Sequence, residues 1–392
     1  MREVTVFVGG STGSEPYSAK TWSGSSQFLL QTMEGARLLD KAVGIRVPRI
    51  PNTLLLARNF TRNRGVWRKH FYFDPSYRNA LTRVASRVLV NSSVLMQIGH
   101  MFSLPDAFPA HKCVSYHDGN LVELLASGFG MEGVSQKRID QALHYEQQAA
   151  QRMAAVFTFS EYLRQSFINN YGVPSDRVFN VGGGINLTEL PEITELPEIT
   201  ELPEITELPE SAPQKNFHSP RILFIGTEFT RKGGPQLLEA FRSVRQSIPS
   251  AELHIVGPTQ IENLPPGAIL HGHLSKSDPE QRAKLESLFR DASLFVLPSL
   301  YEPFGIAPLE AMLYQVPAVV TNAWALREFV TPGVNGALVE KGSAGDLAEK
   351  ITQLLSNPDQ LAGMGKKGRE IVLARYTWPS VVDRMAAIFR SL

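Results

Sequence analysis

The feature that most constrains the fold is a series of short apolar segments that alternate with segments of helical periodicity. In the second half of the chain the apolar segments are RILFIGT (221–227), ELHIVG (252–257), AILHGH (268–273), LFVLPS (294–299) and PAVVTN (317–322). Helices are predicted at 235–248, where proline suits the first position, and at 278–291. Apolar strands separated by helices are typical of parallel sheets that are buried on both faces. The pattern therefore predicts a doubly wound α/β architecture.

The first half of the chain repeats this alternation. A helical pattern begins at Gln27 and includes Leu39, a long helix is predicted over 135–156, and apolar segments lie at 4–10, 94–102, 111–118, 155–160 and 177–186. A Gly/Ser-rich loop, 11–26, joins the first strand to the first helix, and free N–H groups at such a helix start can bind phosphate. Because 392 residues are long for one core, we predict two doubly wound domains with a ligand cleft between them.

Residues 187–210 separate the two halves and consist of four copies of the hexapeptide [Leu/Ile]-Thr-Glu-Leu-Pro-Glu. A proline at every sixth position excludes a continuous helix. The apolar residues and the glutamates each recur every third residue, so each set would follow one edge of a polyproline II helix. A β-solenoid is an alternative for hexapeptide periods, but four copies barely exceed one coil. We predict an acidic tether, disordered or polyproline II-like, inserted between two working domains.

The net charge of +1 hides an uneven distribution, because the repeat alone carries eight glutamates and no basic residue. Residues 46–87 hold nine arginines and one lysine against a single acid, Asp74, and aromatic residues such as Trp67, Phe71, Tyr72 and Phe73 are interleaved. One interpretation is a solvated basic face, and another is contact with an anionic membrane surface. Nucleic acid is not predicted as a partner, because no nucleic-acid motif accompanies the charge. A further hypothesis is that the acidic repeat folds back on this basic stretch.

The composition predicts a cytoplasmic protein, and the membrane interpretation of 46–87 would place it peripherally on the inner face of the membrane. A single cysteine, Cys113, excludes an internal disulfide and a cysteine cluster for zinc. No apolar run reaches the ~18 residues of a membrane-spanning helix. The first residues, MREVTVFVGG, lack the charged start and cleavage site of a signal peptide.

The most specific motif is VLPSLYEPFGIAPLEAM (296–312), in which a strand leads through a loop into a helix. It resembles the E-x7-E signature of the retaining glycosyltransferases of family 4, with Glu302 and Glu310 as the two glutamates. The stretches FIGTEFTRKGG (224–234), VSYHDGN (114–120) and VGGGIN (181–186) are also similar to that family. The resemblance implies the GT-B fold, in which two Rossmann-like domains face each other across a cleft.

The same resemblance implies a nucleotide-sugar donor whose diphosphate lies beside Arg231 and Lys232. The residues agree with this role, because these cations stand where a strand passes into a helix, followed by two glycines that permit close approach. No Asp-x-Asp occurs in the chain, so the charge of the leaving diphosphate must be met by cations and helix N-termini. We therefore predict no metal ion and no cofactor.

The remaining site residues are also assigned by the resemblance. Glu310 is expected to bind the ribose, and Glu302 to bind the donor sugar near the reacting carbon. His117 is expected to act with Glu302 as a catalytic residue from the opposite side of the cleft. Further donor contacts are expected from the backbone of Phe304, Gly305 and Ile306, from the glycine loop at Gly24, and from Leu274 near the base.

The resemblance thus predicts a retaining, metal-independent hexosyltransferase that uses a UDP- or GDP-sugar, with a glycolipid or polysaccharide as candidate acceptor in glycan biosynthesis. The family's usual glycines are replaced by Gln315 and Ala325, which leaves the donor sugar open. The alternatives are a sugar-nucleotide epimerase of the same fold and a non-catalytic protein that binds sugar nucleotides. We predict an acceptor-side domain over 1–186 and a linker over 187–219. A nucleotide-sugar domain is predicted over 220–378, and a terminal helix over 379–392 that packs back on the first domain.

Overall fold

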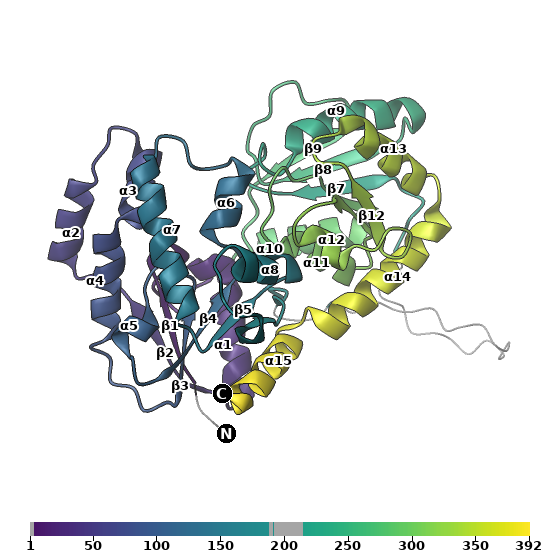
Figure 1. Ribbon diagram of the computed structural model, residues 1–392. Helices are drawn as coiled ribbons and strands as arrows, with labels where there is room; N and C mark the ends of the chain where they lie inside the picture. The colour runs from purple at the N-terminus through teal and green to yellow at the C-terminus, as the bar shows by residue number, and fades with distance from the viewer. Residues whose placement is uncertain (1–3, 188–190, 192–214) are drawn as a thin grey trace, which may run out of the picture. The chain divides into compact units, whose positions relative to one another are not determined.

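The computed structural model describes residues 4–187, 191 and 215–392, so nearly all of the predicted tether lies outside the described residues (Figure 1). By its contacts the chain divides into two compact units. The first contains Met1–Asn186, Tyr301–Phe304 and Ala374–Leu392, and the second contains Leu187–Leu300 and Gly305–Leu373. Two segments of the predicted domain 220–378, at 301–304 and 374–378, therefore count with the first unit.

The first unit is built on a six-stranded sheet in which every neighbouring pair is parallel, in the order β2-β1-β3-β4-β5-β6. Its strands are β1 (Val4–Gly9), β2 (Leu39–Ile45), β3 (Val94–Ile98), β4 (Lys112–His117), β5 (Ala155–Thr158) and β6 (Val178–Asn180). Its helices are α1 (Ser25–Gly35), α2 (Arg49–Arg58), α3 (Arg64–Phe73), α4 (Pro75–Ala85), α5 (Leu104–Ala107), α6 (Leu121–Ser127), α7 (Gln136–Gln151), α8 (Glu161–Asn169) and α15 (Trp378–Ser391). Short 3-10 turns lie at Gly10–Thr12, Thr21–Gly24 and Ser175–Arg177.

The second unit contains another six-stranded parallel sheet, in the order β12-β11-β10-β7-β8-β9. Its strands are β7 (Arg221–Ile225), β8 (Glu252–Val256), β9 (Ala268–Gly272), β10 (Leu294–Leu297), β11 (Ala318–Thr321) and β12 (Gly336–Val339). Its helices are α9 (Gly234–Ser247), α10 (Pro279–Asp291), α11 (Ile306–Leu313), α12 (Leu326–Phe329), α13 (Ala344–Leu355) and most of α14 (Pro358–Arg375). Figure 1 shows α9 and α13 packed side by side.

The predicted doubly wound parallel sheets are confirmed, but two strands were missed. The helical pattern from Gln27 was extended too far, since α1 ends at Gly35 and Leu39 begins the strand β2. The other missed strand is β12, Gly336–Val339. Both β2 and β12 are edge strands and are only partly buried, so neither shows the continuous apolar run that marks a central parallel strand.

The last helix, α15, lies beside α1 within the first unit (Figure 1). Its apolar face, which includes Val381 and Met385, is buried. The indole N–H of Trp378 donates to Asn186 Oδ1 at 3.1 Å, which fixes the start of α15 to the end of the VGGGIN segment. Among the described residues, no helix combines the length and the apolar character needed to cross a membrane.

The basic stretch 46–87 folds into α2, α3 and α4, and its charges are not all on the surface. Arg78 is 1% exposed and forms an ion pair with Glu146 at 3.2 Å, so this arginine belongs to the core. The only acid of the stretch, Asp74, caps α4 by accepting a hydrogen bond from the Ser76 N–H at 2.8 Å. The basic face is therefore smaller than the count of arginines suggests.

Candidate active site

In the second unit, the loops that follow β7 and β10 meet at one edge of the sheet. These strands are parallel neighbours, so their carboxyl ends lie together. The backbone N–H of Leu300, after β10, donates to the carbonyl oxygen of Arg231, after β7, at 2.8 Å. The predicted diphosphate loop and the predicted E-x7-E loop are thus joined directly, at the edge where ligands of doubly wound sheets bind.

The Arg231–Lys232 loop is shaped by glycines. Gly233 has φ of 76° at the start of α9, and a Cβ added there would lie 2.0 Å from the carbonyl oxygen of Pro298. The Lys232 side chain runs over Gly226, where an added Cβ would lie 2.3 Å from its Cδ. The Arg231 guanidinium forms an ion pair with Glu228, with its Nε 2.6 Å from the carboxylate. Two cations therefore lie next to the N-terminus of a fourteen-residue helix.

The second glutamate of the motif lies on the helix that follows this loop. Gly305 adopts φ of 93° and precedes α11, so the chain turns into the helix in a conformation that favours glycine. Ile306 is the first residue of α11, and Glu310 lies in its second turn, only 3% exposed. Its carboxylate forms an ion pair with Lys276, which the sequence analysis did not identify.

Lys276 belongs to the loop between β9 and α10, which also carries the predicted base contact, Leu274. That side chain is partly buried. Because Lys276 reaches Glu310, the loop after β9 is brought to the same edge as the loops after β7 and β10. The second unit thus gathers Arg231, Lys232 and Glu310 with Gly305, Ile306 and the Leu274 loop.

In the first unit, His117 is the last residue of β4 and is 1% exposed. Its ring stacks on that of His100, with the centroids 3.8 Å apart, and neither of its ring nitrogens has a hydrogen-bond partner in the described part of the chain. Burial, and then the neighbouring His100, hold the pKa of His117 well below its ordinary value. His117 is therefore neutral near pH 7, with ring nitrogens that a ligand could use.

Beside His117 stands Asp118, a residue that the sequence analysis passed over. Burial is the main cause that raises the pKa of Asp118, and the charge of Glu302 raises it further, while a hydrogen bond from the Trp22 side chain acts in the opposite direction. Glu302 is itself 7% exposed and lies in the segment that counts with the first unit. A buried carboxyl group whose pKa is raised by burial and by a neighbouring charge is a frequent feature of functional sites.

The last predicted element of the first unit is the glycine loop around Gly24, which leads into α1. Gly24 has φ of 89° and precedes α1, after two residues, Trp22 and Ser23, that also have positive φ. The Asn186 side-chain amide donates to the Ser23 carbonyl oxygen at 3.2 Å and to Ser25 Oγ at 3.0 Å, which holds the loop in place. Phe304 packs edge-on against Phe159, with the ring centroids 5.0 Å apart.

The predicted residues are thus brought together in two sets, one in each unit. The first unit holds Gly24, His117, Glu302 and Phe304, and the second holds Arg231, Lys232, Leu274, Gly305, Ile306 and Glu310. Within the described residues no group of three or more His, Cys, Asp or Glu side chains could hold a metal ion. The roles assigned to these residues stay predictions.

Known structures share this architecture over the whole chain. The sucrose-phosphate synthase of Thermosynechococcus elongatus matches with a TM-score of 0.67 and 16% identity, covering 100% of this chain and 99% of that one. The Anabaena protein HepE, in complex with UDP and glucose, matches with a TM-score of 0.65 and 17% identity, covering 100% of both chains. The two parallel sheets are those of the GT-B glycosyltransferase structures.

The sequence comparisons match mainly the second unit of the chain. Residues 209–371 match the model of the family described as glycosyl transferases group 1. The D-inositol 3-phosphate glycosyltransferase 1 of Catenulispora acidiphila is 30% identical over 173 residues, which are 42% of this chain and 41% of that protein. The chain spans less than half of the length of the curated relatives it matches, with 48%, 41% and 39% for three of them.

Proposed function

We propose that this protein is a retaining, metal-independent glycosyltransferase that moves a hexosyl group from a UDP- or GDP-sugar to an acceptor hydroxyl. The observation that carries the proposal is the junction of the two loops in the second unit, where Leu300 hydrogen-bonds to Arg231. This junction holds two cations, two helix N-termini and a buried carboxylate at one edge of a parallel sheet. A nucleoside diphosphate has matching chemistry, with an anionic diphosphate and a ribose that donates hydrogen bonds.

Donor binding is divided among these groups. Arg231 and Lys232 neutralise the diphosphate, and Glu310 accepts hydrogen bonds from the ribose hydroxyls while Lys276 holds its carboxylate. The N–H groups at the start of α11, exposed by the turn at Gly305, stabilise the phosphate and the sugar. The complex of HepE with UDP and glucose supports a nucleotide-sugar ligand for this architecture.

In the reaction, the bond between the anomeric carbon and the diphosphate oxygen breaks on the same face on which the acceptor oxygen attacks. The proton of the acceptor hydroxyl passes to the leaving phosphate oxygen. Glu302 binds the donor sugar near the reacting carbon, and neutral His117, which belongs to the same unit as Glu302, offers a ring N–H to that sugar. Because the charge that develops lies on the diphosphate, Arg231 and Lys232 supply the stabilisation that a metal ion supplies elsewhere.

The test is incubation of the full chain with a panel of UDP- and GDP-sugars, with and without EDTA, followed by measurement of the free nucleoside diphosphate. We expect release from at least one donor, unchanged by EDTA. Glu302→Gln should reduce that release about 100-fold while the affinity for the nucleoside diphosphate changes little. Failure of every donor would contradict the proposed activity, and loss with EDTA that magnesium restores would contradict metal independence.

We also propose that the protein works in the cytoplasm and binds an anionic membrane surface through 46–87. Leu54 on α2 and Phe60 beyond its end are 68% and 64% exposed, and Arg62 and Arg64 follow closely in the chain. Exposed apolar side chains beside cations suit the membrane interface. In flotation with phosphatidylglycerol vesicles, Leu54→Glu should reduce binding, whereas Leu89→Glu, at an 88% exposed leucine outside α2 and α3, should not. Equal binding to neutral phosphatidylcholine vesicles would contradict this proposal.

A further inference from the structure

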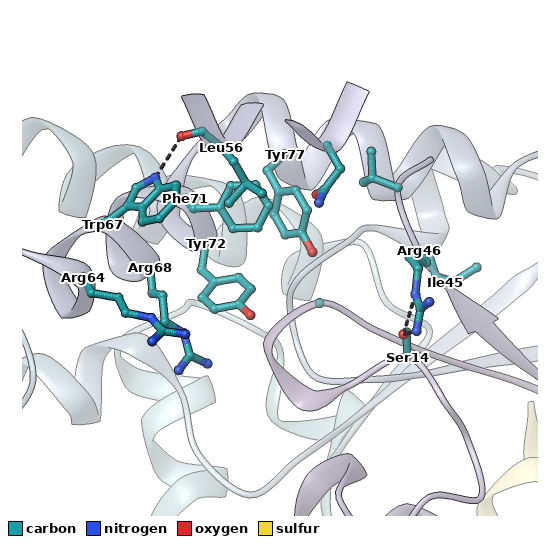
Figure 2. Close-up of a pocket in the computed structure, with 13 residues that line it drawn as sticks. Ser14, Ile45, Arg46, Leu56, Arg64, Trp67, Arg68, Phe71, Tyr72 and Tyr77 are labelled. Atoms are coloured by element: carbon teal, nitrogen blue, oxygen red, sulfur yellow. Dashed lines mark hydrogen bonds between the residues drawn. The ribbon is translucent and has the colours of Figure 1, made fainter. Parts of the chain in front are cut away.

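The first unit contains a cavity of about 400 Å³ that includes none of the predicted site residues. It lies where β1 and β2 end, because Gly10 and Ser14 follow β1, and Arg46 follows β2. Residues of α2 and α3 close the other side (Figure 2). Carboxyl ends of parallel strands are the edge at which such sheets bind ligands, so the cavity has the position of a ligand site.

Three arginines face this cavity from two sides. Arg64 and Arg68 lie one turn apart on α3, and Arg46 lies opposite them, beside Ser14 (Figure 2). The Arg46 guanidinium, which is exposed, donates hydrogen bonds to Ser14 Oγ at 3.1 and 3.2 Å and forms an ion pair with Glu15 at 2.9 Å. Neither Arg64 nor Arg68 has a carboxylate partner among the described residues. Like charges one turn apart on a helix repel each other, and an anion between them would relieve that repulsion.

The wall between the arginines is aromatic and carries hydroxyl donors. The hydroxyls of Tyr72 and Tyr77 point into the space between Arg46 and Arg68 in Figure 2. Tyr77 is 7% exposed, and burial raises its pKa to about 12, so it keeps its proton at neutral pH. Its hydroxyl has no hydrogen-bond partner within the described part of the chain. Trp67 is fixed in the wall by donating its indole N–H to the Leu56 carbonyl oxygen at 2.8 Å.

We propose that this cavity binds the phosphate group of a phosphorylated acceptor, which deepens the proposed function and rests on it. Guanidinium forks from two sides and two hydroxyl donors match the several oxygens of a phosphate. The volume exceeds that of a phosphate and falls in the range of small-molecule sites, so there is room for the polyol or sugar that carries the acceptor hydroxyl. The connection between β1 and α1 supplies both Ser14 of this cavity and Gly24 of the candidate active site, so both residues follow the carboxyl end of the same strand.

The phosphate could belong to a soluble molecule or to a lipid headgroup, and two arms of one experiment separate these sources. Calorimetry measures binding of glycerol 1-phosphate, with glycerol as the neutral control, and flotation measures binding to phosphatidylglycerol vesicles. The test variant is Arg64→Gln/Arg68→Gln. The matched control is Arg83→Gln/Arg87→Gln, which removes the same charge from exposed positions outside the cavity.

We expect the wild-type protein to bind glycerol 1-phosphate but not glycerol, with at least a tenfold loss of affinity in the test variant and at most a twofold loss in the control. Loss of vesicle binding in the test variant alone, without binding of the soluble probe, would also support the phosphate site and assign it to a lipid headgroup. No binding of either probe, or equal losses in both variants, would overturn the proposal. Binding of UDP, which the proposed function assigns to Arg231, Lys232 and Glu310 of the second unit, should be the same in the wild-type protein and in both variants. Loss of phosphate binding with normal UDP binding is therefore a failure of the acceptor site alone, whereas absence of UDP binding in the wild-type protein is a failure of the proposed function.

Discussion

Gly24 and Gly233 occupy equivalent positions in the two units, but their surroundings differ. Each follows the loop after the first strand of its sheet, has positive φ and stands at the start of a helix. A Cβ added at residue 233 would lie 2.0 Å from a backbone oxygen, whereas one added at residue 24 would lie no closer than 3.5 Å to any atom considered. The loop of the second unit is therefore packed against its neighbour, and the loop of the first unit has space beside its glycine.

The difference between the two loops suggests that the two units differ in how far their candidate site residues are preorganised. The second unit fixes its cations in advance, through the hydrogen bond between Leu300 and Arg231 and the close contact at Gly233. Preorganised groups of this kind stabilise charge without reorganising during the reaction. In the first unit, by contrast, the neutral imidazole of His117 has no hydrogen-bond partner among the residues that the structure describes, and there is open space at Gly24. Under the proposed function, the first unit would accommodate the sugar and the acceptor at these positions.

The largest expected effect comes from adding a methyl group at these two glycines. Gly233→Ala should lower the free energy of unfolding of the second unit by about 2–5 kcal/mol, because it adds overpacking to the left-handed strain. Gly24→Ala should cost about 1–2 kcal/mol, since only the strain applies. Urea unfolding followed by hydrogen exchange of peptides from each unit measures both values. An equal loss of unfolding free energy in the two variants would contradict the difference in packing between the two loops.

The ion pair of Glu310 offers a second test of the preformed site. Lys276→Met leaves a carboxylate that is 3% exposed without its partner, so the variant should bind UDP about tenfold more weakly. Lys284→Met on α10 removes the same charge from an exposed position that has no ion pair in the described residues and should leave the affinity unchanged. Calorimetric titration with UDP measures both. Normal affinity of Lys276→Met would mean that Glu310 needs no partner to bind its ligand.

The sequence predicted the central strands and the loops that join them, because these strands are apolar on both faces and bounded by glycines and prolines. It did not predict β2, since Asp40 and Lys41 interrupt the apolar run at an edge where solvent is available. Nor could spacing predict the pair of Lys276 and Glu310, which are far apart in the chain and meet only through the folding of the sheet. Asp118 was missed for a similar reason: its perturbed pKa depends on burial and on Glu302.

The buried imidazoles of the first unit predict a dependence of stability on pH. The pKa values of both His100 and His117 are lowered, mainly by burial, so the unfolded chain binds more protons than the folded one below about pH 6.5. Stability should therefore fall as the pH decreases from 7.5 to 5.5. The slope contributed by each histidine is at most about 1.4 kcal/mol per pH unit.

The matched variant is His117→Gln, which removes one titrating group and keeps a polar side chain. Its stability curve over the same range should be flatter than that of the wild-type protein, while the contribution of His100 persists. Thermal unfolding at several pH values, monitored by near-ultraviolet circular dichroism, gives both curves. Parallel curves for the two proteins would indicate that His117 is protonated in the folded state, contrary to the lowered pKa.

The smallest effect concerns two non-glycine residues in the left-handed region, one in each unit. Arg37, which is exposed, has φ of 55°, and Gln315, which is 7% exposed, has φ of 57°. Glycine relieves about 1–2 kcal/mol of strain but costs about 0.5–1 kcal/mol through the freedom of the unfolded chain. Arg37→Gly should therefore raise the free energy of unfolding by up to about 1 kcal/mol. Gln315→Gly should raise the free energy of unfolding by less, because this change also removes a buried side chain. Urea unfolding of both variants measures the two changes. A larger increase for Gln315→Gly than for Arg37→Gly would show that the Gln315 side chain is itself poorly accommodated.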